Sequence, residues 1–261
     1  MRRTVAWLHG YTMSSAIWPQ LWSLLPEADH VGIDLPGHGE RAGERMPKTL
    51  DEWALVVAED LRRSGARDLV GLSFGSSIAV QVAANHPDLV DRLVLGAPTL
   101  SGAADDRAAR AKYFLLMMRM RELGPGRDLA RVWMSDPPPI FRGLRRDEQR
   151  YAAMEQIVAA HPFTELRTGA MSALSATVQD ATVLARVRAT TLILVGTEDM
   201  PQFRANAEII AEQAPDATVV VLPGAGHLPL LEQPDRCAHL LSDFWGQPVP
   251  ARVPVNAVRA S

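Results

Sequence analysis

Short apolar runs rich in β-branched residues alternate with longer helix-forming stretches along most of this chain. Runs such as VAWL, LVLGA and LILVG are continuously apolar, as expected of strands that helices cover on both faces. Strands that alternate with helices favour a mostly parallel sheet with right-handed crossover connections. The sequence therefore predicts one α/β domain. The predicted strands are Thr4–Leu8, His30–Leu35, Asp68–Leu72, Arg92–Ala97, Thr191–Gly196 and Thr218–Pro223.

Helix-forming stretches lie between these strands and close the domain. A chain of 261 residues, 47% of them hydrophobic, is long enough to bury one large core with an inserted subdomain. The predicted helices are around Ala16–Leu25, Leu50–Ser64, Ser76–Asn85, Phe203–Gln213 and Asp235–Trp245.

The alternation is interrupted once, between about residues 101 and 188. This stretch contains no strand candidate, and its helix-like sequence is broken by GPG at 124–126 and PPP at 137–139, which predict hard turns. We expect a helical cap over 101–188, inserted into a core formed by 1–100 and 189–246. An extended tail is expected over 247–261.

The charge of this cap differs from that of the rest of the chain. Residues 101–190 carry 14 Lys and Arg against 10 Asp and Glu, a net +4, and the remaining residues carry 13 against 20, a net −7. Solvated arginines on amphipathic helices explain this difference. The alternative is a cap that helps to bind an anionic substrate, such as a carboxylate or a phosphopantetheine-type thioester. The run at 113–120 places flexible Met residues beside Phe. Together with Trp133 it would suit an apolar acyl site.

Composition excludes several classes of partner. A formal net charge of −3 gives no nucleic-acid-binding footprint, and no apolar run approaches the roughly 18 residues that span a bilayer. The apolar stretch before His9 is too short for a signal peptide. One cysteine, Cys237, fits a reducing compartment and a buried helix position. We expect a cytoplasmic protein without a metal or cofactor, since the histidines are scattered.

The most informative motif is G-x-S-x-G at Gly71, Ser73 and Gly75. It stands between a predicted strand and a predicted helix, and a strand that turns sharply into a helix exposes the side chain at the turn. The two glycines are needed because a Cβ at either position would collide across so tight a turn. This setting predicts that Ser73 is a nucleophile.

A serine hydroxyl needs a base to remove its proton and an acid to orient that base, here in the order Ser, acid, His. Asp199 follows the predicted strand TLILVG, and His227 stands in a glycine-rich loop after TVVVLP. Both therefore lie at strand ends, where ligands gather in open α/β sheets. Glu198 is the adjacent rival acid, and Asp105 or Asp106 is a more distant one.

Acyl chemistry also needs hydrogen-bond donors for the oxyanion. The backbone N–H of Phe74, directly after the nucleophile, is one expected donor. Gly10 would let the loop after the first strand bend so that the N–H of Tyr11 is the other. We expect the Tyr11 and Phe74 side chains to flank the reacting carbonyl, and His38, in a Pro/Gly turn, to be structural.

The segments HGYTMSS, DLPGHG, GLSFGS, GTED and GAGHLPLLEQP, in that order and spacing, resemble the α/β-hydrolase superfamily over almost the whole chain. The chain is most similar to the small group of carboxylesterases, enol-lactonases, pimeloyl-carrier methyl esterases and menaquinone-pathway enzymes. The resemblance implies a Ser73–Asp199–His227 triad, Tyr11 and Phe74 amides as the oxyanion hole, and a helical cap. His9 stands so early that we expect about six strands rather than eight. Ser76 replaces a glycine that many relatives carry.

These features predict a serine hydrolase that cleaves a carboxylic ester or thioester through an acyl-enzyme on Ser73. A lyase or cyclase on the same site is the nearest alternative, and a silent ligand-binding protein is a further one. The expected partner is a small acyl substrate, anionic or carrier-linked, and the oligomeric state is not predicted. The expected substrate pocket is lined by Gly10, Tyr11, Phe74, Phe114, Met117, Trp133 and Leu228.

Overall fold

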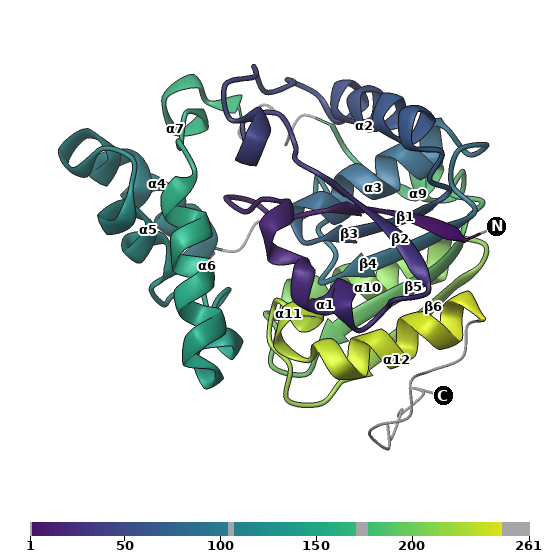
Figure 1. Ribbon diagram of the computed structural model, residues 1–261. Helices are drawn as coiled ribbons and strands as arrows, with labels where there is room; N and C mark the ends of the chain where they lie inside the picture. The colour runs from purple at the N-terminus through teal and green to yellow at the C-terminus, as the bar shows by residue number, and fades with distance from the viewer. Residues whose placement is uncertain (1, 104–106, 171–176, 247–261) are drawn as a thin grey trace.

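A computed structural model describes residues 2–103, 107–170 and 177–246. Within these ranges six strands form one sheet in the order β2-β1-β3-β4-β5-β6, and every neighbouring pair is parallel. The predicted α/β fold and its parallel sheet are thus confirmed (Figure 1). The tail predicted over 247–261 lies outside the described residues. The strands are β1 (Arg3–Leu8), β2 (Ala28–Ile33), β3 (Asp68–Leu72), β4 (Arg92–Gly96), β5 (Thr190–Gly196) and β6 (Ala217–Leu222).

All six predicted strands are present, and only β2 begins two residues before its predicted start. The strand β2 lies at the edge of the sheet and pairs with β1 alone, from Arg3 opposite Ala28 to Leu8 opposite Ile33. An edge strand tolerates polar residues because one of its sides faces solvent. Ala28 and Asp29 therefore belong to the strand, although the polarity of Asp29 hides this start in the sequence.

The order of the strands creates a switch point between β1 and β3. From β1 the chain passes to β2 on one side of it, and then returns to place β3, β4, β5 and β6 on the other. Loops that leave the carboxyl ends of β1 and β3 therefore diverge in direction and leave a crevice between them, where ligands bind in open α/β sheets. Ser73 follows β3, and the loop at residues 9–13 follows β1.

Helices cover both faces of the sheet. Val5 and Trp7 of β1 join a hydrophobic cluster with α1 and α12, and Ala6 and Leu8 join a second cluster with α2, α3 and α10. Successive strand side chains point to opposite faces, so each strand contributes to both clusters. The helices outside residues 101–188 are α1 (Pro19–Ser23), α2 (Leu50–Ser64), α3 (Phe74–Asn85), α10 (Pro201–Gln213), α11 (Pro229–Glu232) and α12 (Pro234–Trp245).

Local sequence signals set the ends of several helices. Thr49 caps α2 by accepting a hydrogen bond from the Glu52 amide, and Gly65 ends the helix with a positive φ of 69°. The helix predicted around 16–25 is divided into a 3-10 turn at Ser15–Ile17 and the short α1. The division falls at Pro19, whose missing N–H and fixed φ suit the first position of a helix.

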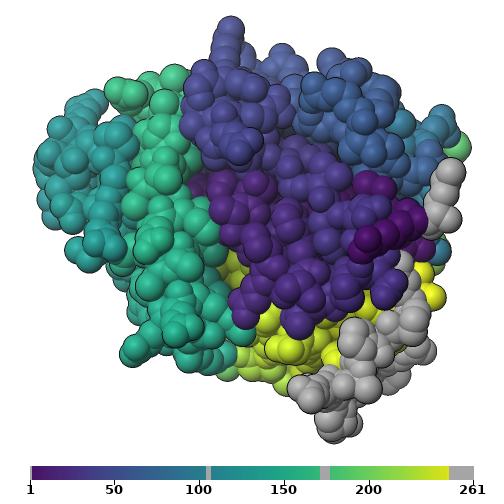
Figure 2. Space-filling view, viewed as in Figure 1, coloured from purple at the N-terminus to yellow at the C-terminus, as the bar shows by residue number. Residues whose placement is uncertain are grey.

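The described part of the 101–188 segment is helical, as predicted, and contains no strand. The GPG sequence separates α4 from α5. Figure 1 shows α4–α7 beside the sheet rather than on one of its faces, and Figure 2 shows them packed against the N-terminal part of the chain. The helices are α4 (Arg107–Leu123), α5 (Arg127–Met134), α6 (Glu148–Ala160), α7 (Glu165–Thr168) and α9 (Ala181–Leu184).

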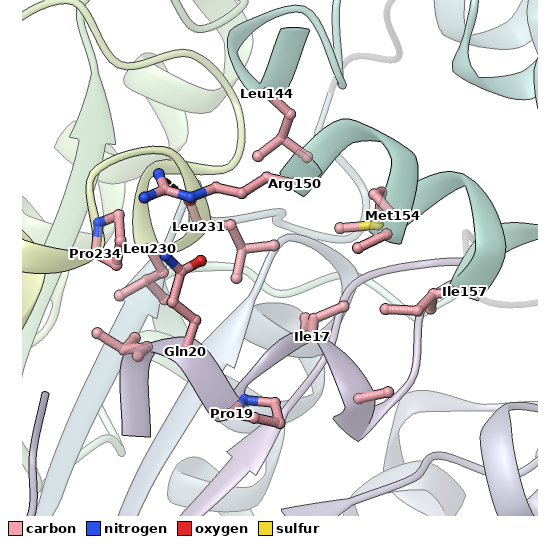
Figure 3. Close-up of a pocket in the computed structure, with 13 residues that line it drawn as sticks. Ile17, Pro19, Gln20, Leu144, Arg150, Met154, Ile157, Leu230, Leu231 and Pro234 are labelled. Carbon is pink, nitrogen blue, oxygen red and sulfur yellow. Dashed lines mark hydrogen bonds between the residues drawn. The ribbon is translucent and has the colours of Figure 1, made fainter. Parts of the chain in front are cut away.

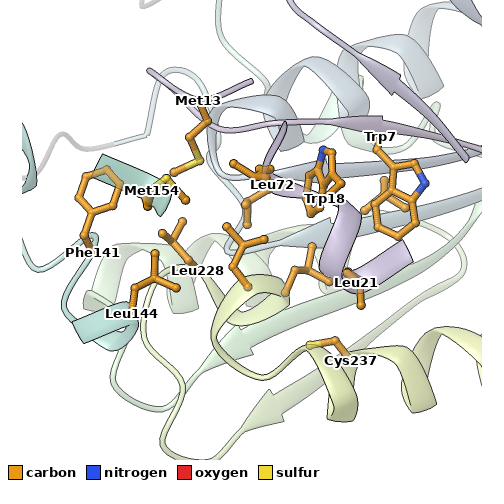
Figure 4. Close-up of a cluster of buried hydrophobic side chains, with 14 of the residues drawn as sticks. Trp7, Met13, Trp18, Leu21, Leu72, Phe141, Leu144, Met154, Leu228 and Cys237 are labelled. Atoms are coloured by element: carbon orange, nitrogen blue, oxygen red, sulfur yellow. The ribbon is translucent and has the colours of Figure 1, made fainter. Parts of the chain in front are cut away.

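Apolar side chains of this segment extend the cluster that begins at Trp7. Figure 4 shows Phe141, Leu144 and Met154 continuing the row of buried side chains from Trp18 and Leu72. The segment therefore shares one hydrophobic core with the sheet instead of building its own. No helix within the described ranges combines the length and apolarity that crossing a membrane requires.

Candidate active site

Ser73 alone forms the turn between β3 and α3. The strand ends at Leu72, the helix begins at Phe74, and Ser73 has φ 51° and ψ −117°. Its N–H donates to the carbonyl of Gly96 at 2.8 Å, and its own carbonyl accepts the Ser76 amide at 2.8 Å. A positive φ is uncommon for a residue with a Cβ, so these bonds hold Ser73 in a strained conformation.

The two glycines of the motif are required by close backbone approaches. A Cβ on Gly71 would lie 2.6 Å from the carbonyl oxygen of Gly75, and one on Gly75 would lie 2.5 Å from that of His9. Neither backbone can move away, since one belongs to α3 and the other follows β1. The glycines thus let the start of α3 lie against the end of β1.

Three side chains from three strand ends form a continuous hydrogen-bonded chain. Ser73 Oγ lies 2.8 Å from His227 Nε2, and His227 Nδ1 lies 2.9 Å from Asp199 Oδ1. A carboxylate can only accept, so Nδ1 carries the proton and Nε2 is free to accept the serine proton. The side chains of His227 and Asp199 are 2% and 0% exposed. This arrangement can activate a serine for nucleophilic attack.

Among the described residues, the alternative acid Glu198 does not contact His227 as Asp199 does. Glu198 is half exposed and pairs with Arg146, away from His227. Asp199 instead receives the Met200 amide on Oδ1 at 2.7 Å, which fixes its carboxylate toward the imidazole. Asp105 and Asp106 lie outside the described residues.

Sequence reasoning missed the residue that shapes the His227 loop. The Glu232 carboxylate accepts the Gly226 amide at 2.6 Å and the Leu228 amide at 2.9 Å, the two amides on either side of His227. Burial raises the pKa of Glu232, and these amides oppose the shift. The ring of Phe203 packs on the imidazole with 4.2 Å between centroids. The signal available in the sequence was the acid five residues after His227.

The loop after β1 lies directly beside the nucleophile. A Cβ on Gly10 would be 3.5 Å from Ser73 Cβ. Phe74 is the first residue of α3, so its N–H has no partner within the helix. Among the described residues, neither the Phe74 nor the Tyr11 amide has a backbone acceptor. Both are therefore available to an oxyanion formed at Ser73.

Comparison with known proteins identifies the family. The model of the alpha/beta hydrolase family matches residues 5–240. The chain belongs to the alpha/beta hydrolase family. The resemblance found in the sequence motifs is thereby confirmed, and so is the fold of about six strands.

Two curated relatives and one solved structure illustrate the likeness of this hydrolase-family chain. It is 29% identical to the dihydrolipoyllysine-residue acetyltransferase component of an acetoin cleaving system from Cupriavidus necator, over 93% of this chain and 63% of that protein. It is 29% identical to a pimeloyl-[acyl-carrier protein] methyl ester esterase from Aromatoleum aromaticum, over 90% and 95%. A thermophilic esterase from Thermogutta terrifontis matches with a TM-score of 0.74 at 24% identity, over 94% and 89%, and shows the same fold. The family and the relative named as a methyl ester esterase support ester hydrolysis in general.

Three of the predicted pocket residues, Tyr11, Trp133 and Leu228, lie beside the site of this alpha/beta hydrolase. The ring of Tyr11 faces that of Trp133 with 5.3 Å between centroids. Leu228, next to His227, is fully buried. Phe74 differs from its prediction, because its ring packs edge-on against Trp53 of α2 at 5.5 Å and joins the cluster on that face. Its side chain is thus committed to packing and does not flank the reacting carbonyl.

Phe114 and Met117, which were predicted to line the substrate pocket, lie on α4 away from the residues that surround Ser73. Phe114 is 61% exposed. Both residues line a groove of about 580 Å³ between α4 and α7, and no residue of the Ser73–His227–Asp199 chain lines it. The helix turns another face inward, since Lys112, Leu116 and Met120 are its buried residues. The run at 113–120 hides this because apolar residues stand on its exposed face as well as on its buried one.

A separate apolar cavity of about 150 Å³ lies between the sheet domain and α6. Figure 3 shows Ile17, Met154 and Ile157 on one side of it, and Leu230 and Leu231 on the other. Leu230 also reaches the end of β4, where a Cβ on Gly96 would be 2.9 Å from its Cδ1. No residue of the hydrogen-bonded chain lines this cavity. Within the described ranges no group of three or more His, Cys, Asp and Glu is placed to hold a metal.

Proposed function

We propose that Ser73, His227 and Asp199 form a catalytic triad with which the chain hydrolyses a carboxylic ester or thioester. The observation that carries the proposal is the continuous contact from Ser73 Oγ through the imidazole to the Asp199 carboxylate, at 2.8 and 2.9 Å. Its support is strengthened by the strained φ of 51° at Ser73, which a merely structural serine would not need.

The mechanism follows from the protonation that these contacts require. His227 Nε2 takes the Ser73 proton while Oγ attacks the acyl carbon, and the carbonyl electrons move to the oxygen. When the tetrahedral intermediate collapses, the bond to the leaving oxygen or sulfur breaks and His227 returns the proton to it. Water, deprotonated by the same Nε2, then releases the acid from the acyl-enzyme and restores Ser73. Asp199 stabilises the imidazolium in both steps.

The amides of Tyr11 and Phe74 complete the proposed site as oxyanion donors. Each such donor lowers the barrier by roughly 3–4 kcal/mol when it is aimed at the developing charge. Gly10 lies beside Ser73, so the loop that carries the Tyr11 amide runs next to the nucleophile. The position of Phe74 at the start of α3 adds the favourable end of the helix dipole.

We further propose that the 101–188 segment is a cap that admits a small acyl substrate. A relative is named for a methyl ester on an acyl-carrier protein, which supports a carrier-linked acyl group here. Much of the segment's positive charge is already paired, with Arg127 and Arg131 both held by Glu155. Arg121 and Arg167 line the groove between α4 and α7, where no carboxylate partner is described for either. In this proposal they attract an anionic part of the substrate that extends beyond the Ser73 site into this groove.

Fluorophosphonate labelling tests the proposal. Wild-type protein should be labelled on Ser73, and Ser73→Ala should lose both labelling and turnover of p-nitrophenyl butyrate. Equal labelling or turnover in Ser73→Ala would sink the nucleophile assignment. Product formation in ¹⁸O-labelled water separates hydrolysis, which places the label in the acid, from lyase or cyclase chemistry, which does not.

A further inference from the structure

The 101–188 segment contacts two consecutive residues of the loop that carries the proposed oxyanion donor. The hydroxyl of Tyr11 donates to Glu165 Oε1 of α7. The Trp133 Nε1–H of α5 donates to the Thr12 hydroxyl oxygen at 2.8 Å. Both contacts join residues more than 120 positions apart in the chain. Hydrogen bonds from both α5 and α7 therefore hold this loop.

The buried carboxylate of Glu165 needs the hydrogen bond from the Tyr11 hydroxyl. Its side chain is 0% exposed, and its two carboxylate oxygens lie 3.2 Å from His161 Nε2. A buried carboxylate is costly unless hydrogen bonds replace the water it has lost. Tyr11 and His161 supply these bonds, so moving α7 away from the loop would leave the carboxylate poorly satisfied. Burial and the neighbouring Glu165 raise the pKa of Tyr11 well above its usual range, so its hydroxyl stays a donor.

The second contact holds the strained part of the loop. Thr12 has a positive φ of 63° and is fully buried. Its hydroxyl donates to the Tyr11 carbonyl at 2.6 Å and accepts from Trp133. The Trp133 ring also faces the Tyr11 ring. The Tyr11–Thr12 peptide is therefore held by the Thr12 hydroxyl, which Trp133 of the segment fixes in turn, while the preceding Gly10 carbonyl accepts the Met13 amide at 3.2 Å.

We propose that Glu165 is a positioning residue, which acts with Trp133 to aim the Tyr11 amide at the oxyanion, so that the oxyanion hole is complete only while the cap is seated. This proposal rests on the proposed function above. It makes the cap a part of the catalytic machinery as well as a wall of the pocket. Transition-state stabilisation, rather than substrate binding, should respond when the contact is removed.

The test compares Tyr11→Phe, Glu165→Leu and Glu165→Gln with Tyr113→Phe as the matched control. The hydroxyl of Tyr113 lies 3.4 Å from the backbone carbonyl of Glu165 and does not touch the carboxylate. The measurements are kcat and KM for p-nitrophenyl butyrate, the affinity for a trifluoromethyl ketone that forms an oxyanion on Ser73, and the midpoint of thermal unfolding.

Tyr11→Phe and Glu165→Leu should each lower kcat and ketone affinity by roughly 10- to 50-fold, less than complete loss of a donor, with KM within about twofold. The double variant should resemble either single variant, because both changes break the same bond. Glu165→Gln retains an acceptor for Tyr11 and should recover most of the activity. Tyr113→Phe should behave as the wild type.

Two results separate failure of this inference from failure of the proposed function. If wild-type Ser73 is labelled by fluorophosphonate, but Tyr11→Phe and Glu165→Leu alter only the unfolding midpoint, the contact is structural and the positioning role is wrong. If wild-type Ser73 is not labelled, the proposed nucleophile is wrong and the positioning role falls with it.

Discussion

The parallel sheet and the 101–188 segment are held by different kinds of contact. Main-chain ladders join neighbouring strands in a fixed register. The segment instead reaches the sheet domain through side chains. Gln179 bonds to Ser77 and Gln81 of α3, and several other polar contacts fall on segments that carry the proposed site. Trp133 and Glu165 bind the loop after β1, while Arg146 binds Glu198 and Arg150 donates to the Glu232 carbonyl at 3.2 Å.

This difference indicates that the sheet and the 101–188 segment contribute to the proposed site in different ways. Strand ends fix where the proposed nucleophile, base and acid meet, because their positions follow from the sheet. The segment acts on the same loops from outside and adjusts how precisely they are held. Changes in the sheet domain's triad should therefore abolish activity, whereas changes in the contacts made by the segment should reduce it by degrees.

The largest expected effect comes from Asp199→Asn. The amide would favour the wrong imidazole tautomer, and we expect kcat to fall by roughly 10³- to 10⁴-fold, as in other Ser-His-Asp sites. The control is Glu198→Gln, the adjacent acid that pairs with Arg146 of the segment, for which we expect less than about a twofold change, as for exposed ion pairs. Steady-state kinetics with p-nitrophenyl butyrate measure both. A reversed order would move the acid to Glu198.

Glu232→Gln tests the support of the His227 loop. A neutral amide accepts more weakly than a carboxylate, so the Gly226 and Leu228 amides lose part of their anchor. We expect kcat to fall by roughly 10- to 30-fold, about 1.4–2 kcal/mol, which is near the lower end of the roughly 1.5–3 kcal/mol typical of hydrogen bonds to charged groups. Glu208→Gln, an exposed change on α10, is the control. Unchanged kcat together with unchanged pH dependence would show that Glu232 does not position His227.

Acid should weaken the region where the two parts meet. Burial lowers the pKa of His9 to about 4, and lowers that of His38 well below its usual range. Their rings lie 5.0 Å apart, and His38 lies 4.5 Å from His161 of the segment. Because the unfolded chain binds these protons near pH 6.5 and the folded chain only at lower pH, stability falls as pH drops through this window.

For His9 alone the free energy of unfolding should fall by about 2 kcal/mol between pH 7 and pH 5. Urea unfolding at pH 7, 6 and 5 measures it, and His38→Gln should reduce the slope. A free energy that is constant over this range would contradict the neutral, buried state of both rings.

The smallest expected effect concerns the segment's charge. Reversing Arg121 and Arg167 to Glu should raise KM for an anionic acyl thioester by roughly threefold at low salt and leave a neutral ester unchanged, since exposed charges contribute little and are screened. Arg127→Gln with Arg131→Gln, whose partner is Glu155, is the control. Equal KM values for both substrates in both variants would remove the electrostatic role of the segment.

The sequence predicted the sheet well because each strand is a local signal. Continuous apolar runs marked β3, β4 and β5, while the polar Asp29 obscured only the start of the edge strand β2. Helix α3 begins at Phe74 rather than the predicted Ser76, because the turn consists of Ser73 alone. Ser76 itself is fully buried, and its hydroxyl accepts the Thr99 amide at 2.9 Å.

The site was predictable to the extent that its residues follow strands. Ser73, Asp199 and His227 each stand just past a strand end, and the structure brings them together as predicted. Glu165 could not be found in this way, since its contact with Tyr11 spans 154 residues and leaves no local pattern. The exposed orientation of Phe114 could not be predicted, because periodicity cannot orient a helix whose exposed face also carries apolar residues.

The most direct test of the central claim is an acyl-enzyme on Ser73. Mixing the protein with p-nitrophenyl acetate should give a burst of nitrophenolate close to one equivalent, and peptide mapping after acid quench should find the acetyl group on Ser73. Ser73→Ala should give neither. A burst that persists in Ser73→Ala, or an acetyl group found on another residue, would contradict the account.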